Sequence, residues 1–139
     1  MRSTWVWIAM ICQFLAALTH AIGLFVSLPP ANATEAELTK LMTEYKLNAG
    51  GGFHPSMENL FLSLSISFGL LLLFGGLLNL YFLRKKLTGG LLKHLLLIQV
   101  FIFGCSFVVM AMLTFLIPII STGLIFISLV VAWVMTSRE

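Results

Sequence analysis

Five residues in the first half of the chain have side chains suited to binding or proton transfer in an apolar environment. His20 lies in one long apolar stretch, and His54, Glu58, Asn59 and Ser65 lie around the start of the next. Ionisable side chains are costly inside a bilayer and usually mark a site or a water-filled cavity. We therefore expect an outward-facing ligand cavity with His20 at its floor and Ser65 as the direct partner of His20. The other three residues would form its rim.

Two of these residues also have simpler interpretations. Glu58 follows His54-Pro55 closely, and a carboxylate in the first turn of a helix is stabilised by the helix dipole without any substrate. His20 could equally be a neutral imidazole that hydrogen-bonds to a neighbouring helix. The spacing of the residues does not decide between packing and binding.

Other chemistries fit the sequence less well. His20, His54 and His94 are expected at different depths, which argues against a haem held by two histidines and against the converging ligands that zinc needs. Cys12 and Cys105 have no C-x-x-C pairing, which favours small core residues over a disulfide enzyme. The chain contains no P-loop, no G-x-S-x-G sequence and no aspartate. We expect no catalytic residue, no metal ion and no cofactor.

Three amide side chains, those of Gln13, Asn79 and Gln99, lie within apolar stretches and are expected to hold helices together. Asn79 lies five residues before Arg84, and Gln99 lies six residues after Lys93, so the two share a similar depth. A short turn would bring their helices together as an antiparallel hairpin. We predict a hydrogen bond between them or to a neighbouring backbone group, worth about 0.6 kcal/mol on the membrane average.

The composition indicates that membrane-spanning helices hold these residues. Hydrophobic residues make up 60% of the chain and charged residues 9%, with a mean hydropathy of +1.06, whereas a soluble domain has about 25% charged residues. A helix needs about 20 apolar residues to cross the hydrocarbon. The uncharged stretches predict an all-α, polytopic four-helix bundle that forms a single transmembrane domain over residues 1–139. The predicted spans are residues 4–28, 55–83, 91–116 and 121–136, the last two divided at Pro118.

The basic residues predict how the bundle is oriented. One side of the four-span arrangement carries Arg2, Arg84, Lys85, Lys86, Lys93 and Arg138, and the other carries Lys40 and Lys46. Because Lys and Arg mark the cytoplasmic side, we expect both termini in the cytoplasm. The first apolar run is longer than the roughly 7–15 residues of a signal peptide, which favours a retained span. A net charge of +3 on so apolar a chain does not indicate nucleic-acid binding.

The outer loop, residues 29–54, is the only substantial segment expected outside the bilayer. Thr34 and Glu37 have capping-box spacing, and the apolar residues that follow have helical spacing, so we predict a short amphipathic helix over residues 34–47. Its polar face is mainly acidic, unlike that of most membrane-surface helices. This favours a lid over the bundle, hinged at Gly50-Gly51-Gly52, with a helix on the lipid surface as the alternative. The apolar stripe comprises Leu38, Leu41, Met42 and Tyr45.

Fragments of the first 80 residues resemble a group of small uncharacterised bacterial four-span inner-membrane proteins. The similar fragments are residues 15–25, LAALTHAIGLF, and residues 54–61, HPSMENLF, with a continuation at residues 67–71, SFGLL. Members of that group have a histidine in the first span and a Gly- and Phe-rich second span. The resemblance implies a four-helix bundle in a bacterial inner membrane and supplies no catalytic residue.

Two classes of function are compatible with these features. The first is an accessory or structural subunit that packs against larger membrane proteins or against copies of itself, using the Phe-rich second and third spans. The second is a binder, less readily an enzyme, of a lipid, quinone or sterol-like molecule in the outward cavity near His20. We prefer the first because it requires nothing of the residues beyond packing. Membrane lipids are expected partners in either case.

Overall fold

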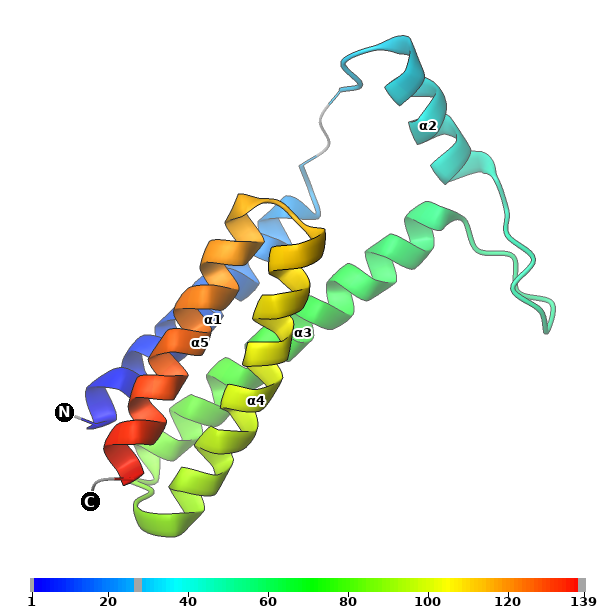
Figure 1. The fold of residues 1–139 in the computed structure, drawn as a ribbon. Helices are drawn as coiled ribbons and strands as arrows, with labels where there is room; N and C mark the ends of the chain where they lie inside the picture. The colour runs from blue at the N-terminus through cyan, green and yellow to red at the C-terminus, as the bar shows by residue number, and fades with distance from the viewer. Residues whose placement is uncertain (1, 27–28, 138–139) are drawn as a thin grey trace. The chain divides into compact units, whose positions relative to one another are not determined.

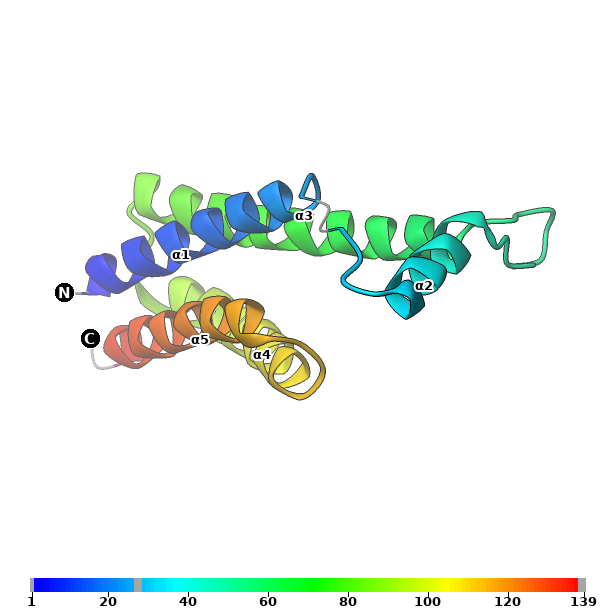
Figure 2. The same cartoon turned by 90° about the horizontal axis from the view of Figure 1, so that it is seen from above.

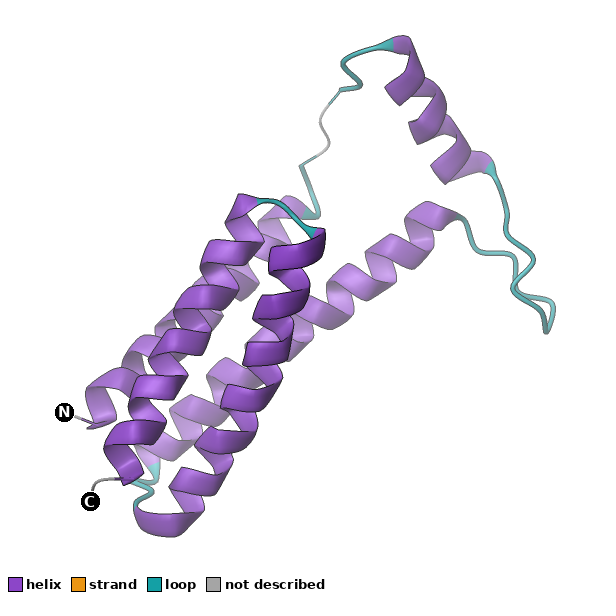
Figure 3. Ribbon diagram, in the orientation of Figure 1, coloured by secondary structure: helices purple, strands orange, loops and turns teal. Residues whose placement is uncertain are grey.

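The computed structural model describes residues 2–26 and 29–137, and this part of the chain is helical apart from its loops (Figures 1 and 3). The helices are α1 (Arg2–Gly23), α2 (Ala33–Glu44), α3 (Met57–Arg84), α4 (Gly89–Leu113) and α5 (Leu116–Ser137). The chain forms two compact units. We call residues Met1–Leu18 with Leu70–Glu139 the bundle unit, and residues Thr19–Gly69 the loop unit.

Four of the helices are long and apolar enough to cross a membrane, in agreement with the four predicted spans. Their spanning ranges are Thr4–Gly23, Met57–Arg84, Gly89–Leu113 and Leu116–Thr136. Helices suit this environment because they satisfy every backbone hydrogen-bonding group internally. The all-α architecture is confirmed, and the chain is a small multi-pass membrane protein. Arg138, one of the residues used to predict orientation, lies outside the described residues.

The bundle unit contains a part of each of the four spanning helices. Helices α4 and α5 lie side by side and antiparallel, joined by a short turn (Figures 1 and 2). The side chains that fill the core are mostly aliphatic, with two phenylalanines, and many other large apolar side chains remain exposed on the outer faces. The most deeply buried apolar residues are Val6, Ala9, Leu72, Phe82, Leu92, Leu96, Phe103, Ile125, Leu129 and Ala132.

The turn between α4 and α5 lies earlier in the sequence than predicted. We expected Pro118 to divide the last two spans, but α4 ends at Leu113 and α5 already begins at Leu116. Pro118 therefore lies in the first turn of α5, where a missing backbone N–H removes no intrahelical hydrogen bond. Thr114, in an extended conformation, caps α4 instead, and its backbone N–H donates to the carbonyl of Met110 at 3.0 Å.

Helix α1 ends sooner than the apolar composition suggested. The predicted end, Leu28, lies outside the described residues, and the helix itself ends at Gly23. Beyond it, the N–H groups of Leu24 and Phe25 donate to carbonyls three residues earlier, at 3.2 and 3.0 Å, which marks a tightened last turn. His20 is thus about 4.5 Å from the helix end at 1.5 Å per residue, not the 12 Å that the longer span implied.

Helix α2 is the predicted amphipathic helix with different ends. It covers Ala33–Glu44, where residues 34–47 were expected, and its N-cap is Asn32. The side chain of Asn32 accepts from the backbone N–H of Glu35 at 2.9 Å, and Glu35 accepts from the backbone N–H of Ala31 at 2.7 Å. The predicted Thr34–Glu37 capping pair is therefore wrong. Asparagine is as favourable an N-cap as threonine or better, and it occurs two residues earlier.

Residues 46–56 form a small hairpin between α2 and α3. Lys46 and Ser56 make an antiparallel bridge, and the backbone N–H of Leu47 donates to the carbonyl of Pro55 at 2.9 Å. The three glycines that we expected to act as a joint form its turn, with φ values of 81°, 57° and 81° at Gly50, Gly51 and Gly52. These left-handed conformations explain why glycine is needed at the turn.

Helix α3 begins after the hairpin, at Met57. Ser56 is 1% exposed, and its Oγ accepts from the backbone N–H of Asn59 at 3.3 Å, the geometry of an N-cap. Pro55, which we expected inside the first turn, therefore precedes the helix.

Candidate functional site

His20 contacts the residue that the sequence suggested, Ser65, through the backbone carbonyl of that residue. Its Nε2 lies 2.8 Å from the backbone carbonyl oxygen of Ser65. A carbonyl oxygen only accepts, so Nε2 carries the hydrogen in this contact. The Phe68 ring packs edge-on against the imidazole at a centroid distance of 5.3 Å. A Cβ on Gly69 would lie 3.3 Å from Cδ2 of His20, so the absence of a side chain there makes room for the ring.

The remaining members of the predicted cavity lie elsewhere in the loop unit. His54 is exposed in the hairpin, and Glu58 and Asn59 are exposed in the first turn of α3. Ser65 follows Glu58 by seven residues, which is about 10 Å along the helix. His20 and Ser65 are therefore brought together, whereas Glu58 lies two turns away from this pair. The position of Glu58 matches that of a carboxylate stabilised by the helix N-terminus.

The loop unit contains an apolar groove that the sequence predicted only in part. One wall is the expected stripe of α2, and the other consists of Met57 and Phe61 at the start of α3. The groove has a volume of about 420 Å³ and is lined by Leu38, Leu41, Met42, Tyr45, Met57 and Phe61. None of the five predicted cavity residues is among these. The i, i+4 spacing of Met57 and Phe61 is the signal that could have identified the second wall.

The amide side chains of Gln13, Asn79 and Gln99 form one hydrogen-bonded network in the bundle unit. Nδ2 of Asn79 donates to Oε1 of Gln13 at 2.8 Å and to Oε1 of Gln99 at 3.1 Å. Nε2 of Gln99 donates to Oδ1 of Asn79 at 3.0 Å, and Nε2 of Gln13 donates to Oε1 of Gln99 at 3.4 Å. The predicted bond between Asn79 and Gln99 is confirmed. All three side chains are at least 96% buried, with exposures of 0, 0 and 4%.

Close helix packing makes this network possible. A Cβ built on Gly75 would lie 2.5 Å from Nε2 of Gln13 and 3.1 Å from Cζ of Phe103. A Cβ built on the next residue, Gly76, would lie 3.0 Å from the ring of Phe14. These glycines let α1 approach α3 closely, as small residues do between membrane helices. Because amides do not titrate and all three oxygens have donors, the network holds three helices together and offers no acid or base.

The remaining reactive side chains are dispersed. Cys12 is half-buried and Cys105 is exposed, and both are free thiols. Within residues 2–26 and 29–137, no three side chains of His, Cys, Asp or Glu are grouped so that they could hold a metal ion.

Comparisons with protein-family models, with curated proteins and with solved structures give no match to this chain.

Proposed function

We propose that the protein is an accessory or structural subunit that packs against larger membrane proteins in a bacterial inner membrane. The similarity of residues 15–25 and 54–61 to small bacterial four-span proteins supports the location. The division of basic residues, six on one side and two on the other, supports an orientation with both termini in the cytoplasm.

The observation that carries the proposal is how the bundle unit uses its buried polar side chains. The three amides bond one another, and the hydroxyls of Thr122, Ser128 and Thr136 each donate to a carbonyl four residues earlier in α5. The amides thus join three helices, and the three hydroxyls find their acceptors within α5 itself. The bundle unit presents an apolar outer surface to neighbouring molecules in the membrane. Such a surface can pack against another transmembrane helix.

The contact surface that we favour is a groove on α4 and α5. It has a volume of about 540 Å³ and is lined by Val100, Phe101, Gly104, Cys105, Val108, Val109 and Phe126. Cys105 is small, which permits close approach of another transmembrane helix, whereas Gly104 makes room for the Phe126 ring of the same chain, which would lie 3.0 Å from a Cβ built there. The partner helix would present large apolar side chains to fill the groove between Phe101 and Val108.

Site-specific photo-crosslinking tests this proposal. A photoreactive amino acid at Val108, in the groove, should give a discrete protein adduct in intact membranes. The same residue at Ile11, which is 48% exposed on α1, serves as the matched control. An adduct of twice the chain mass would identify a second copy as the partner. Lipid adducts alone from both positions would overturn the proposal.

A second candidate function, binding of a lipid, quinone or sterol-like molecule, is favoured by the groove of the loop unit. Its volume of about 420 Å³ lies within the roughly 300–1,000 Å³ of small-molecule sites, and such sites are mostly apolar. Tyr45 adds an amphipathic ring of the kind found at membrane interfaces. His20 lies in the same unit, where it is held by Ser65 and Phe68.

Purification in mild detergent followed by native mass spectrometry distinguishes the two candidates. A retained small molecule that is lost on Leu41→Trp, which fills the groove, would support the binder. His20→Phe is the control, because His20 does not line the groove and the molecule should still be retained. If nothing is retained by the natural protein, or if Leu41→Trp retains the same molecule, the result would favour the accessory subunit.

A further inference from the structure

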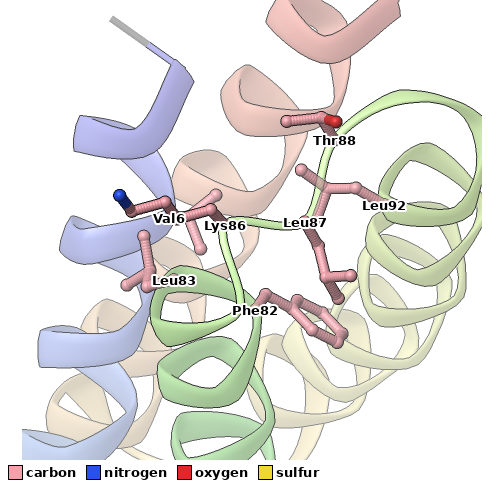
Figure 4. Close-up of a pocket in the computed structure, with 7 residues that line it drawn as sticks. All are labelled: Val6, Phe82, Leu83, Lys86, Leu87, Thr88 and Leu92. Atoms are coloured by element: carbon pink, nitrogen blue, oxygen red, sulfur yellow. The ribbon is translucent and has the colours of Figure 1, made fainter.

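A small pocket lies where α3 turns into α4. Its walls are apolar side chains from three helices and the turn, and two polar side chains, Lys86 and Thr88, lie at its edge (Figure 4). The pocket has a volume of about 150 Å³ and is lined by Val6, Phe82, Leu83, Lys86, Leu87, Thr88 and Leu92. A volume of about this size is large enough for a benzene-sized apolar group.

The backbone of the turn places Lys86 at the edge of the pocket. The N–H of Leu87 donates to the carbonyl of Phe82 at 3.1 Å, and the N–H of Lys86 donates to that of Leu83 at 3.2 Å. This is the Schellman pattern that ends many helices, and its left-handed residue is usually glycine. Here the position is held by Lys86, with a φ of 49°. A lysine kept in a conformation that favours glycine suggests that its amine has a use.

The described residues near Lys86 in the sequence carry positive charge and include no carboxylate side chain. Arg84, Lys85, Lys86 and Lys93 lie within ten residues of one another, and Asp and Glu are absent from residues 70–137. The described part of the bundle unit therefore contains no carboxylate side chain to neutralise them. Thr88, the N-cap residue of α4, makes no side-chain capping hydrogen bond. Its exposed hydroxyl can donate to an anion.

We propose that this pocket binds an anionic phospholipid. The phosphate contacts the amine of Lys86, the headgroup reaches the hydroxyl of Thr88 on the opposite side of the pocket (Figure 4), and the first acyl methylene groups enter the apolar pocket. Helix α3 ends at Arg84 and α4 begins at Gly89, so the pocket lies at the ends of two spanning helices, where lipid phosphates lie. Basic pockets between transmembrane helices on the cytoplasmic side are known to recognise anionic headgroups. We propose a lipid, and not a free anion, because the walls of the pocket are apolar.

The test compares two lysine variants of the full-length protein, delipidated in detergent and titrated with phosphatidylglycerol under native mass spectrometry. Lys86→Gly removes the amine and places the favoured residue in the left-handed position, so its thermal melting temperature should be unchanged or higher. Lys85→Ala removes the same charge from a neighbour that does not line the pocket. We expect a loss of at least about tenfold in affinity for K86G, and at most about fivefold for K85A, the effect of one surface charge.

Further measurements identify the part of the lipid that the pocket recognises. K86R should bind as the natural protein does, and phosphatidylcholine should bind at least about tenfold more weakly than phosphatidylglycerol. Deacylated glycerophosphoglycerol and inorganic phosphate should compete poorly. Equal losses for K86G and K85A would overturn the proposal, because the charge would act only through the general surface potential. Equal competition by inorganic phosphate or the deacylated headgroup would overturn the lipid and leave a free-anion site.

Discussion

Replacing Asn79 by leucine removes three hydrogen bonds from the bundle unit while keeping a side chain of similar volume. Nδ2 loses its bonds to Gln13 and Gln99, at 2.8 and 3.1 Å, and Oδ1 loses the bond from Gln99 at 3.0 Å. Interhelical hydrogen bonds in a membrane average about 0.6 kcal/mol, so N79L should lower the free energy of unfolding by about 2 kcal/mol.

The same leucine leaves two amides buried with a single long bond of 3.4 Å between Gln13 and Gln99. A buried polar group without its partner costs more than the removal of both partners. The triple variant Q13L/N79L/Q99L should therefore lose less stability than the sum of its three single variants, by about 1 kcal/mol or more.

Unfolding by SDS in mixed micelles, followed by tryptophan fluorescence, measures these differences. Asn59→Leu is the matched control, because it makes the same change on α3 at an exposed position. It should alter stability by no more than about 0.5 kcal/mol. Additive losses in the triple variant, or an effect of N79L no larger than that of N59L, would refute the view that the amides act as one network.

Three further predictions concern packing, capping and orientation. Gly75→Ala should destabilise the bundle by about 1–3 kcal/mol, because its Cβ would lie 2.5 Å from an amide nitrogen of the network; Gly90→Ala, with nothing within 4 Å, is the control in the same SDS assay. Asn32→Ala should cost α2 about 1 kcal/mol, seen as faster amide hydrogen exchange confined to that helix. A cysteine at Lys40 should react with an impermeant maleimide in intact cells and one at Lys85 only after lysis; the reverse pattern would contradict the orientation.

The four spans were predictable because lipid imposes a single requirement on a long segment. Residues 94–137 contain no Asp, Glu, Lys or Arg, and a helix of that length, about 66 Å, must cross the hydrocarbon twice. The bond between Asn79 and Gln99 was predictable for a similar reason. The number of residues that separates Asn79 from Arg84, and Gln99 from Lys93, gives the depth of each amide in the membrane. A short turn between the two helices leaves amides at the same depth within reach of each other.

The helix ends were predicted less well, because several residues compete to end a helix. Asn32 and Thr34 are both acceptable N-caps, and Pro118 is compatible with a break or with a first turn. The backbone conformation that resolves each choice depends on what the neighbouring segment does. In the hairpin, for example, the bridge between Lys46 and Ser56 fixes the point at which α3 can begin.

The sequence by itself determined that the chain is helical, that four of its helices are long and apolar enough to cross a membrane, and that the first three of these each carry an amide side chain. These properties follow from hydropathy, length and local spacing. Only the tertiary structure decided that Gln13 joins Asn79 and Gln99, that His20 bonds the backbone carbonyl of Ser65, and that Lys86 lines a pocket. Every residue has a carbonyl, and a left-handed lysine has no sequence signature, so such contacts depend on how the backbones pack.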